Sequence, residues 1–363
     1  MKSSDIAQLR MHSQHLWGAP FDTPQDVIHW LGAVQGQDYP VAKWSLAQRT
    51  KGVTGPAIDQ ALADGSILRT HLLRPTWHFV LPADIRWMLE LTGPRVHAQN
   101  AHYYRKAELD ERLLTNTNTL LAKALEGGVQ LTRKEVAAVL ERSGITASGP
   151  RLAYILMHAE LDAVICSGGL NGKQQTYASL EERAPTTQSL DRDEALAELT
   201  RRYFVSRGPA TAKDFVRWSG LTAVDAKIGL EMVSSQLEHE LVDDRDYWFA
   251  PTSQPTRRTT KVADLVQGLD ECIISYSHSR DALRPVPPTP GEPTVFAHAI
   301  LLDGRLIGHW RRDFDKKTVV VEASLYRPLD RSEAGALDAA VERYGTFEGA
   351  PTRLIFTEEG EDQ

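Results

Sequence analysis

Two glutamines, Gln35 and Gln37, stand on either side of Gly36 and are followed by Asp38. An amide side chain offers one acceptor oxygen and two N–H donors, so it can orient a water or a sugar while staying neutral. Glycine frees the backbone, and we expect Gly36 to let both amides face one cavity. Helix capping and ordinary surface hydrogen bonding are the alternative role for this pair.

Aromatic and basic side chains flank the pair and recur about 35 residues later. They are Tyr39, Lys43, Trp44, Arg69, Arg74, Trp77 and His78. Ring faces stack on nucleobases and cationic groups bind phosphates, so this composition favours a nucleic-acid site. Burial in a core is the competing explanation for the two tryptophans.

Signals for other kinds of chemistry are weak. His12 and His15 could share a metal, but no third ligand of suitable spacing accompanies them, so no metal site is predicted. The sequence has no Gly-rich phosphate loop, no Gly-x-Ser-x-Gly and no Cys-x-x-Cys. Cys166 and Cys272 are expected to be buried free thiols. Lys43 could form a Schiff base, but a phosphate contact or surface charge is the expectation.

An internal repeat in the middle of the chain predicts two similar units. Thr132 and Thr211 each begin a capping box, with Glu135 and Asp214 three residues later. Each predicted helix ends at a Ser-Gly pair, and a second amphipathic helix and a pair of strands follow. The glycine-rich segment 168–172 is expected to form the turn between the strands of the first copy. Helix, tight turn, helix and hairpin is the order of a winged helix.

A third, less regular copy precedes these two. Thr23-Pro24 is expected to open a helix that ends near Gly36, and 67–70 and 76–80 are expected to pair as strands. Two further helices, 83–91 and 94–104, are expected to connect this copy to the next one.

The last third of the chain has a different pattern. It follows a polar junction at 252–268 and predicts strands at 269–276, 295–302, 306–310 and 319–323, a proline-rich loop at 284–293 and a helix at 333–344. Asp303-Gly304 is expected to form a hairpin turn. This pattern indicates a small α+β or barrel-like module.

Composition and charge bound the class of protein. Of the 363 residues, 42% are hydrophobic and 25% charged, which is typical of folded globular chains. The net charge of −7 argues against phosphate binding over the whole surface. Residues 261–363 carry 12 basic and 18 acidic side chains, whereas 1–260 carry 29 and 30, so a basic face on the first two thirds remains open. With no apolar leader and no stretch near the roughly 18 apolar residues of a membrane span, we expect a cytoplasmic protein.

Two segments in the first 80 residues, one of which contains the glutamines, resemble the AlkZ-type (AlkZ/YcaQ-like) winged-helix DNA glycosylase family. The first is 33–40 with Lys43-Trp44, and the second is 69–80. Further segments match in the family's order, namely 151–154, 172–177, 181–183, 207–211 and 308–312. Gly36 replaces the small aliphatic residue that is usual between the glutamines, and 269–276 keeps only part of the family's pattern. The resemblance covers nearly the whole chain.

This resemblance implies an α+β fold of three tandem winged-helix units and a β-rich C-terminal domain, arranged around a DNA-binding channel. The expected domains are 1–107, 108–188, 189–260 and 261–363. The family's catalytic Gln-x-Gln pair falls on Gln35 and Gln37. Side chains expected to contact DNA are Lys43, Arg69, Arg74, Trp77, His78, Arg151 and Lys173.

The predicted function is a monofunctional glycosylase that excises N-alkylated bases from duplex DNA in base-excision repair. Alkylation at N7 of guanine or N3 of adenine makes the purine cationic, so it leaves as a neutral base without a strong general acid. Gln37 can hold a water beneath C1′ while Gln35 orients that water or the sugar. No cofactor is expected, and the protein is expected to be a monomer associated with the nucleoid.

A non-catalytic winged-helix DNA-binding protein, such as a transcriptional regulator, is the alternative function. The intact glutamine pair favours the enzyme, because a regulator normally needs a dimerisation helix or an effector domain. Small methyl adducts and bulky natural-product adducts, including cross-links, both remain open as substrates.

Overall fold

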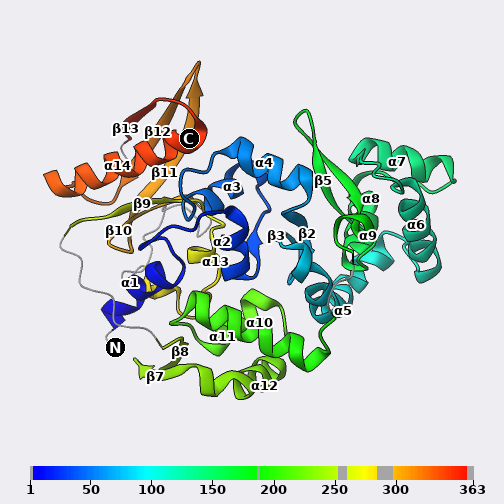
Figure 1. Cartoon of the computed structure of the whole chain (residues 1–363), viewed down its shortest axis with the longest axis horizontal. Coiled ribbons are helices and arrows are strands. Elements are labelled where there is room, and N and C mark those ends of the chain that lie inside the picture. The colour runs from blue at the N-terminus through cyan, green and yellow to red at the C-terminus, as the bar shows by residue number, and fades with distance from the viewer. Residues whose placement is uncertain (1–2, 186–188, 252–259, 284–296, 358–363) are drawn as a thin grey trace.

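The computed structural model describes residues 3–185, 189–251, 260–283 and 297–357 (Figure 1). After the N-terminal helix α1 (Ser3–Ser13), three units of helices and short strands are followed by a C-terminal sheet, which confirms the predicted α+β class. The loop expected at 284–293 lies outside the described residues, as do 252–259 of the expected junction. None of the described helices is long and apolar enough to cross a membrane.

The first unit differs from the prediction at the glutamine pair. The helix expected to end near Gly36 stops at Leu31, because Gly32 turns the chain with a φ of +75°. The next residues form a short strand that pairs with β3. In order, the unit contains α2 (Pro24–Leu31), β1 (Val34–Gln35), α3 (Tyr39–Ala47), α4 (Gly55–Asp64), β2 (Leu68–Leu72) and β3 (Thr76–Val80). Its antiparallel sheet has the strand order β1-β3-β2.

The second unit repeats this arrangement, with the sheet order β4-β6-β5. It contains α6 (Glu111–Ala124), β4 (Leu131–Thr132), α7 (Arg133–Arg142), α8 (Gly149–Leu161), β5 (Ile165–Asn171), β6 (Gln174–Ser179) and α9 (Leu180–Arg183). The capping box of Thr132 and Glu135 is present. The turn predicted at 168–172 is wrong in part, because Gly168-Gly169 lies inside β5. A Cβ at Gly168 would come within 2.5 Å of Thr176 Oγ1, so this strand has room only for glycine there.

The third unit has the same order of elements, with a single bridge between Ala210 and Trp248 in place of the first strand. Its elements are α10 (Arg192–Arg207), α11 (Ala212–Ser219), α12 (Ala223–Val233), the 3-10 turn η1 (Ser234–Gln236), β7 (Glu238–Val242) and β8 (Arg245–Phe249). The predicted capping box of Thr211 and Asp214 is present, and Gly220 ends α11 with a φ of +74°.

One helix, α5 (Pro82–Lys106), connects the first two units, so the prediction of two separate helices was wrong. Proline in a helix interior removes a hydrogen bond and normally ends or kinks the helix. Here Leu91 and Thr92 before Pro94 and Val96 after it are all buried. Packing on both sides of the proline therefore keeps the backbone helical.

The C-terminal sheet has the order β13-β12-β11-β10-β9, with β12 and β13 parallel. Its elements are β9 (Ala263–Val266), α13 (Glu271–Ile274), the 3-10 turn η2 (Arg280–Ala282), β10 (Ala299–Leu302), β11 (Arg305–Asp315), β12 (Thr318–Leu325), α14 (Arg331–Glu348) and β13 (Thr352–Phe356). The strand predicted at 269–276 is wrong, because Asp270 accepts a hydrogen bond from the Cys272 N–H at 2.9 Å and caps the helical turn α13. Strand β9 lies where a polar junction was expected. Asp303 and Gly304 form the predicted turn, both with positive φ.

Two of the hydrophobic cores cross the predicted domain boundaries. One joins α2, α3 and α4 to the C-terminal sheet and α14, and another joins β2, β3 and α5 to α10, α11 and α12. The second unit has a core largely of its own, from Tyr104 to Tyr177. The boundaries stay a prediction, but the first unit is packed between the third unit and the C-terminal sheet, which places its short strand β1 at their junction.

Candidate active site

The backbone of β1 is held by an ion pair from two distant parts of the chain. Glu271 on α13 accepts a hydrogen bond from the Gln35 backbone N–H through Oε1 at 2.9 Å. Arg207, at the end of α10, donates to the carbonyl oxygens of Leu31 and Ala33 at 2.7 and 2.9 Å. Arg207 and Glu271 pair at 2.9 Å, and neither side chain is exposed. This buried ion pair therefore fixes the segment that carries the first glutamine.

Glu271 is held as an anion. Burial alone raises the pKa of a carboxyl, but the Arg207 cation and the Ser275 hydroxyl hold the pKa of Glu271 below its usual value. The Trp218 indole N–H and the Ser275 hydroxyl donate to Oε2 at 2.8 and 2.7 Å. Because so many donors already engage the carboxylate, we expect Glu271 to position β1 rather than to exchange protons.

The two glutamines differ in exposure. Gln35 is buried, and its Oε1 has no hydrogen-bond partner among the described residues. Gln37 is exposed, and its Oε1 accepts a hydrogen bond from the Trp77 backbone N–H at 3.2 Å. One amide therefore lies inside the site and the other at its surface, with its oxygen anchored to β3.

His78 lies opposite Gln35 on β3 and is fully buried. Burial, helped by the nearby Arg74 cation, lowers the pKa of His78 to about 3, so its imidazole is neutral at physiological pH. Its Nδ1 lies 2.9 Å from the Thr76 carbonyl oxygen, which makes Nδ1 the N–H donor. Its Nε2 is then an acceptor, and it has no partner among the described residues.

Gln35 and His78 share one face of the small sheet. Directly opposed residues in an antiparallel pair project their side chains to the same side, with Cβ atoms about 4.5–5.5 Å apart. The pairing of Gln35 with His78 therefore brings two buried acceptors, Oε1 and Nε2, to the same face. Two acceptors in this arrangement suit a molecule that donates two hydrogen bonds, and water is the smallest such molecule.

The backbone at Gly36 does not adopt a conformation that requires glycine. Its φ is not in the positive region, and its backbone N–H donates to the Trp77 carbonyl at 2.7 Å, as in a strand. A Cβ on Gly36 would meet Arg69 Nε and the Phe79 backbone nitrogen at 3.5 Å, which is ordinary van der Waals contact. An alanine would therefore fit at this position.

The pKa of His78 gives the first prediction. Between pH 6.5, the usual pKa of histidine, and about pH 3, His78 is protonated in the unfolded chain but stays neutral in the folded protein. Stability therefore falls as pH decreases, by up to about 1.4 kcal/mol per pH unit for this group. We expect His78→Gln to lose less stability than the wild type between neutral pH and about pH 5 in urea titrations. Equal losses in the two proteins would contradict the low pKa.

A second buried carboxylate, Glu160 on α8, lies beside the aromatic residues of β2 and β3. It pairs with His71 Nδ1, and its Oε1 accepts from the Trp77 indole N–H at 3.2 Å. The Arg69 guanidinium lies 4.5 Å from the Trp77 ring, and its Nε donates to the Gly36 carbonyl at 2.9 Å. Glu160 thus connects the second unit to the strand that carries His78.

Several predicted DNA contacts are engaged within the protein. Arg69 and His78 are buried. Lys43 is bound to both carboxylate oxygens of Asp59 at 2.9 Å. Arg151 donates to the carbonyl oxygens of Thr146, Ala107 and Glu108, and it therefore binds the backbone of the loop after α5. Trp77 and Arg74 are half-buried.

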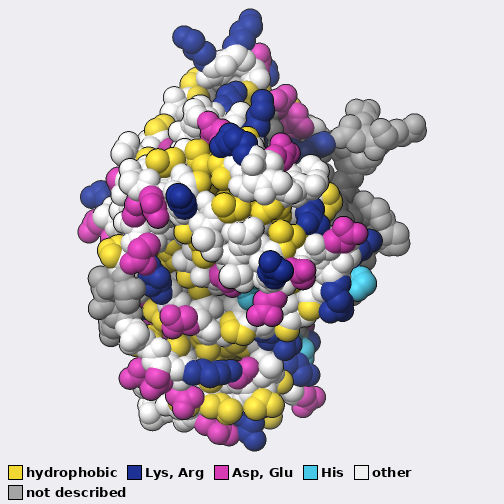
Figure 2. All heavy atoms as spheres, turned by 90° about the vertical axis from the view of Figure 1, so that its right-hand side faces the viewer, with side chains coloured by type: hydrophobic (Ala, Val, Ile, Leu, Met, Phe, Trp, Pro, Cys, Tyr) yellow, Lys and Arg dark blue, Asp and Glu magenta, His cyan; other side chains and the backbone are white. Residues whose placement is uncertain are grey.

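Lys173, the remaining predicted DNA contact, is exposed at the turn of the β5–β6 hairpin. This hairpin projects from the molecule beside α4 (Figure 1). The Ser167 hydroxyl at its base donates to the Arg69 carbonyl at 2.7 Å, which joins β5 to β2. Figure 2 shows the side of the second unit, where basic and acidic side chains are interspersed and neither sign dominates. This side is not the basic face that the charge distribution left open.

Sequence reasoning missed Glu271, Arg207 and Glu160 as parts of the site. Glu271 is 236 positions from Gln35 in the chain, and Arg207 lies 64 positions before Glu271. The one available signal was the match of 207–211 and 269–276 to the family's pattern. Residues so distant in sequence show no mutual spacing that would reveal their contact.

The whole fold is that of a known DNA glycosylase structure. The chain is similar to the structure of the Streptomyces sahachiroi DNA glycosylase AlkZ, with a TM-score of 0.79 at 19% identity, covering 98% of this chain and 100% of that one. It is also 25% identical over 232 residues to the Interstrand DNA cross-link repair glycosylase of Streptomyces sahachiroi. That match covers 61% of this chain and 62% of the relative's length.

The family is defined by a broader match. The family model described as DNA glycosylase AlkZ-like matches residues 28–347, which include most of the first unit, the second and third units and most of the C-terminal sheet. The chain belongs to the AlkZ-like DNA glycosylase family. This match also includes both glutamines, His78 and the ion pair of Arg207 and Glu271.

Proposed function

We propose that this protein is a DNA glycosylase that hydrolyses the N-glycosidic bond of alkylated, cationic purines in duplex DNA. The observation that carries the proposal is the group formed by Gln35, Gln37 and His78. Gln35 and His78 bring to one face of the β1–β3 pair two acceptors that have no partner in the described part of the chain, and Gln37 is exposed two residues after Gln35. Family membership supports the same activity.

The reaction needs no strong acid in this site. Alkylation at N7 of guanine or N3 of adenine gives the base a positive charge, so the base takes the electrons of the C1′–N bond and leaves neutral. A water oxygen forms the new bond to C1′, and its proton passes to the solvent. Gln35 Oε1 and His78 Nε2 can accept the two hydrogens of that water, which fixes the lone pair that attacks. A histidine that stays neutral fits this role as an acceptor.

We assign to Gln37 the role of contacting the nucleotide that enters the site. Glycosylases expose their target by turning the nucleotide out of the duplex, so the entering sugar meets the surface of the site first. The Gln37 amide is exposed and is oriented by the Trp77 N–H. A fixed amide dipole beneath C1′ stabilises the positive charge that develops on the sugar.

The name of one relative supports a proposal about the size of the adduct. One relative is named for the repair of interstrand DNA cross-links. An exposed Gln37 at the surface is compatible with a bulky adduct, because the modified base need not be enclosed. We therefore propose bulky N7-linked adducts, including cross-links, as substrates together with methylated purines.

A single-turnover excision assay tests the proposed function. Duplexes carrying N7-methylguanine or a bulky N7 adduct are incubated with the enzyme, and alkali then cleaves the abasic product. We expect release of the cationic base and no release of unmodified guanine. Inactivity on every cationic lesion, combined with tight sequence-specific DNA binding, would instead indicate a non-catalytic DNA-binding protein such as a transcriptional regulator.

The β5–β6 hairpin is proposed to contact the DNA backbone. Lys173→Glu should weaken duplex binding about equally for all sequences and reduce the slope of log affinity against log salt by about one. Lys123→Glu is the matched control, because it makes the same charge change at an exposed site on α6 of the same unit. Filter-binding titrations at several salt concentrations give the slopes. Unchanged binding for Lys173→Glu would place the DNA elsewhere.

A further inference from the structure

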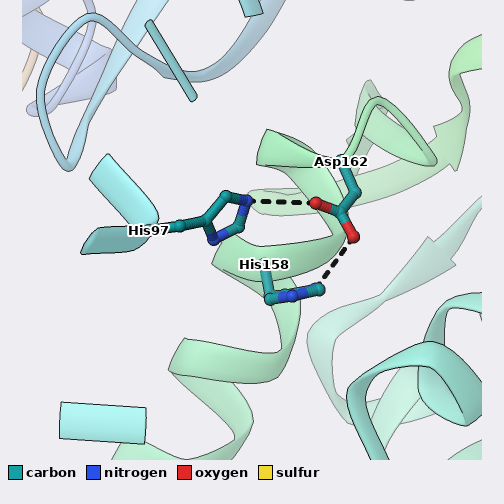
Figure 3. A group of neighbouring side chains, drawn as sticks. All are labelled: His97, His158 and Asp162. Carbon is teal, nitrogen blue, oxygen red and sulfur yellow. Dashed lines mark hydrogen bonds and ion pairs between the residues drawn. The ribbon is translucent and has the colours of Figure 1, made fainter. Parts of the chain in front are cut away.

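A cluster of two histidines and an aspartate lies between α5 and α8, and the proposed function does not use it. His97 comes from the middle of α5, and His158 and Asp162 lie one helical turn apart at the end of α8 (Figure 3). One carboxylate oxygen of Asp162 lies 3.0 Å from His97 Nε2, and the other lies 3.3 Å from His158 Nδ1. Each residue offers a ligand atom, and these atoms all lie within 4.8 Å of one another.

These distances are close to those of a zinc site. Zinc binds imidazole nitrogen and carboxylate oxygen at about 2.0–2.2 Å, so neighbouring ligand atoms of a tetrahedral site are about 3.4 Å apart. His97 Nε2 lies 3.0 Å from Asp162 Oδ1, and His158 Nδ1 lies 3.3 Å from Asp162 Oδ2, so each nitrogen is already near that separation from one carboxylate oxygen. The imidazoles are tilted by 53° with centroids 4.7 Å apart, so their rings do not stack against each other.

The carboxylate of Asp162 is available for a cation. Among the described residues its ion-pair partners are His97 and His158, and no lysine or arginine pairs with it.

Outer hydrogen bonds hold the cluster in place. Asn118 on α6 donates from Nδ2 to Asp162 Oδ2 at 2.7 Å. His97 Nδ1 lies 3.0 Å from the Tyr104 hydroxyl. With Nε2 on a metal, Nδ1–H donates to the tyrosine oxygen, which is the usual support of a ligating histidine. Asn118 Oδ1 is buried without a partner among the described residues.

We propose that His97, His158 and Asp162 form a binding site for one divalent transition metal ion, with Zn²⁺ as the best match. The three side chains supply two nitrogens and one oxygen, which is a donor set that suits zinc. Asp162 is 37% exposed, so the fourth position is open to water and the ion can enter from solvent. The ion would join α5, which packs on the first unit, to α8 of the second unit.

Zinc binding to the untagged, chelator-stripped protein tests the site. Titration with Zn²⁺ against a chromophoric competing chelator measures stoichiometry and affinity, and thermal unfolding with and without Zn²⁺ gives an independent readout. We expect one Zn²⁺ per wild-type chain and a rise in Tm, because a ligand that binds only the folded state stabilises it. His158→Ala and Asp162→Asn should each lose the bound ion and the rise in Tm.

His239→Ala is the matched control. His239 pairs with Asp246 at 2.8 Å on the hairpin of the third unit, with no third ligand in reach among the described residues. This variant removes a histidine–aspartate pair and should bind Zn²⁺ like the wild type. Asp162→Asn keeps the size of the side chain, so its loss of Zn²⁺ is not attributable to unfolding. Failure of the wild type to bind Zn²⁺ in excess, or equal binding by the three variants, would overturn the proposal.

Discussion

Gln37→Ala is expected to lose about a hundredfold or more in the single-turnover rate of base excision from an N7-alkylguanine duplex. The Gln37 amide is exposed and held by the Trp77 N–H, and its removal takes away the dipole that we propose stabilises the charge on the sugar. DNA affinity should stay near that of the wild type, because the lost interaction belongs to the transition state.

Other substitutions at the pair refine this expectation. Gln35→Ala should also lower the excision rate, because it removes one of the two buried acceptors. Gln37→Asp should retain activity or extend it to uncharged lesions, since a carboxylate is the stronger electrostatic partner of the developing cation. Gln25→Ala is the matched control, because that amide binds the Ser66 hydroxyl at 2.8 Å, away from the site. A wild-type rate for Gln37→Ala would remove Gln37 from the mechanism.

Glu271→Gln is expected to destabilise the protein by about 3–5 kcal/mol. The substitution keeps the shape of the side chain but leaves the Arg207 guanidinium buried without its counter-charge. Arg207 and Glu271 together hold the backbone of β1, so loss of the pair loosens the strand that carries Gln35. Urea denaturation followed by far-UV circular dichroism measures the change.

An exposed ion pair is the control for this change in stability. Arg245 and Asp281 lie 2.6 Å apart, and Asp281 is 59% exposed. Asp281→Asn should therefore cost less than about 1 kcal/mol, because solvent screens the pair. Similar costs for Glu271→Gln and Asp281→Asn would show that burial of the first pair contributes little.

Local chemistry explains the parts of the fold that the sequence predicted. Capping boxes need residues only three positions apart, and those at Thr132 and Thr211 start helices as expected. The Asp303-Gly304 turn likewise depends on two adjacent residues that tolerate positive φ. The order of helix, helix and hairpin follows from such signals, which is why the repeat could be predicted.

The errors occur where distant residues decide the structure. The apolar run at 269–276 fits a buried strand or a short buried helix equally well. Asp270 pairs with Arg49 and Glu271 with Arg207, and these buried ion pairs favour the helical turn α13. Packing on both sides of Pro94 similarly overrides the local preference for a break.

The sequence by itself determined the α+β class, the repeated units and the two glutamines that we propose as the catalytic pair. Only the tertiary structure decided that Gln35 is buried opposite a neutral His78, that Glu271 and Arg207 hold its backbone, and that Arg69 and His78 are not on the surface. The reason is physical. Helix caps and turns are satisfied within a few residues, whereas burial, pKa and buried ion pairs depend on contacts between segments up to 236 positions apart.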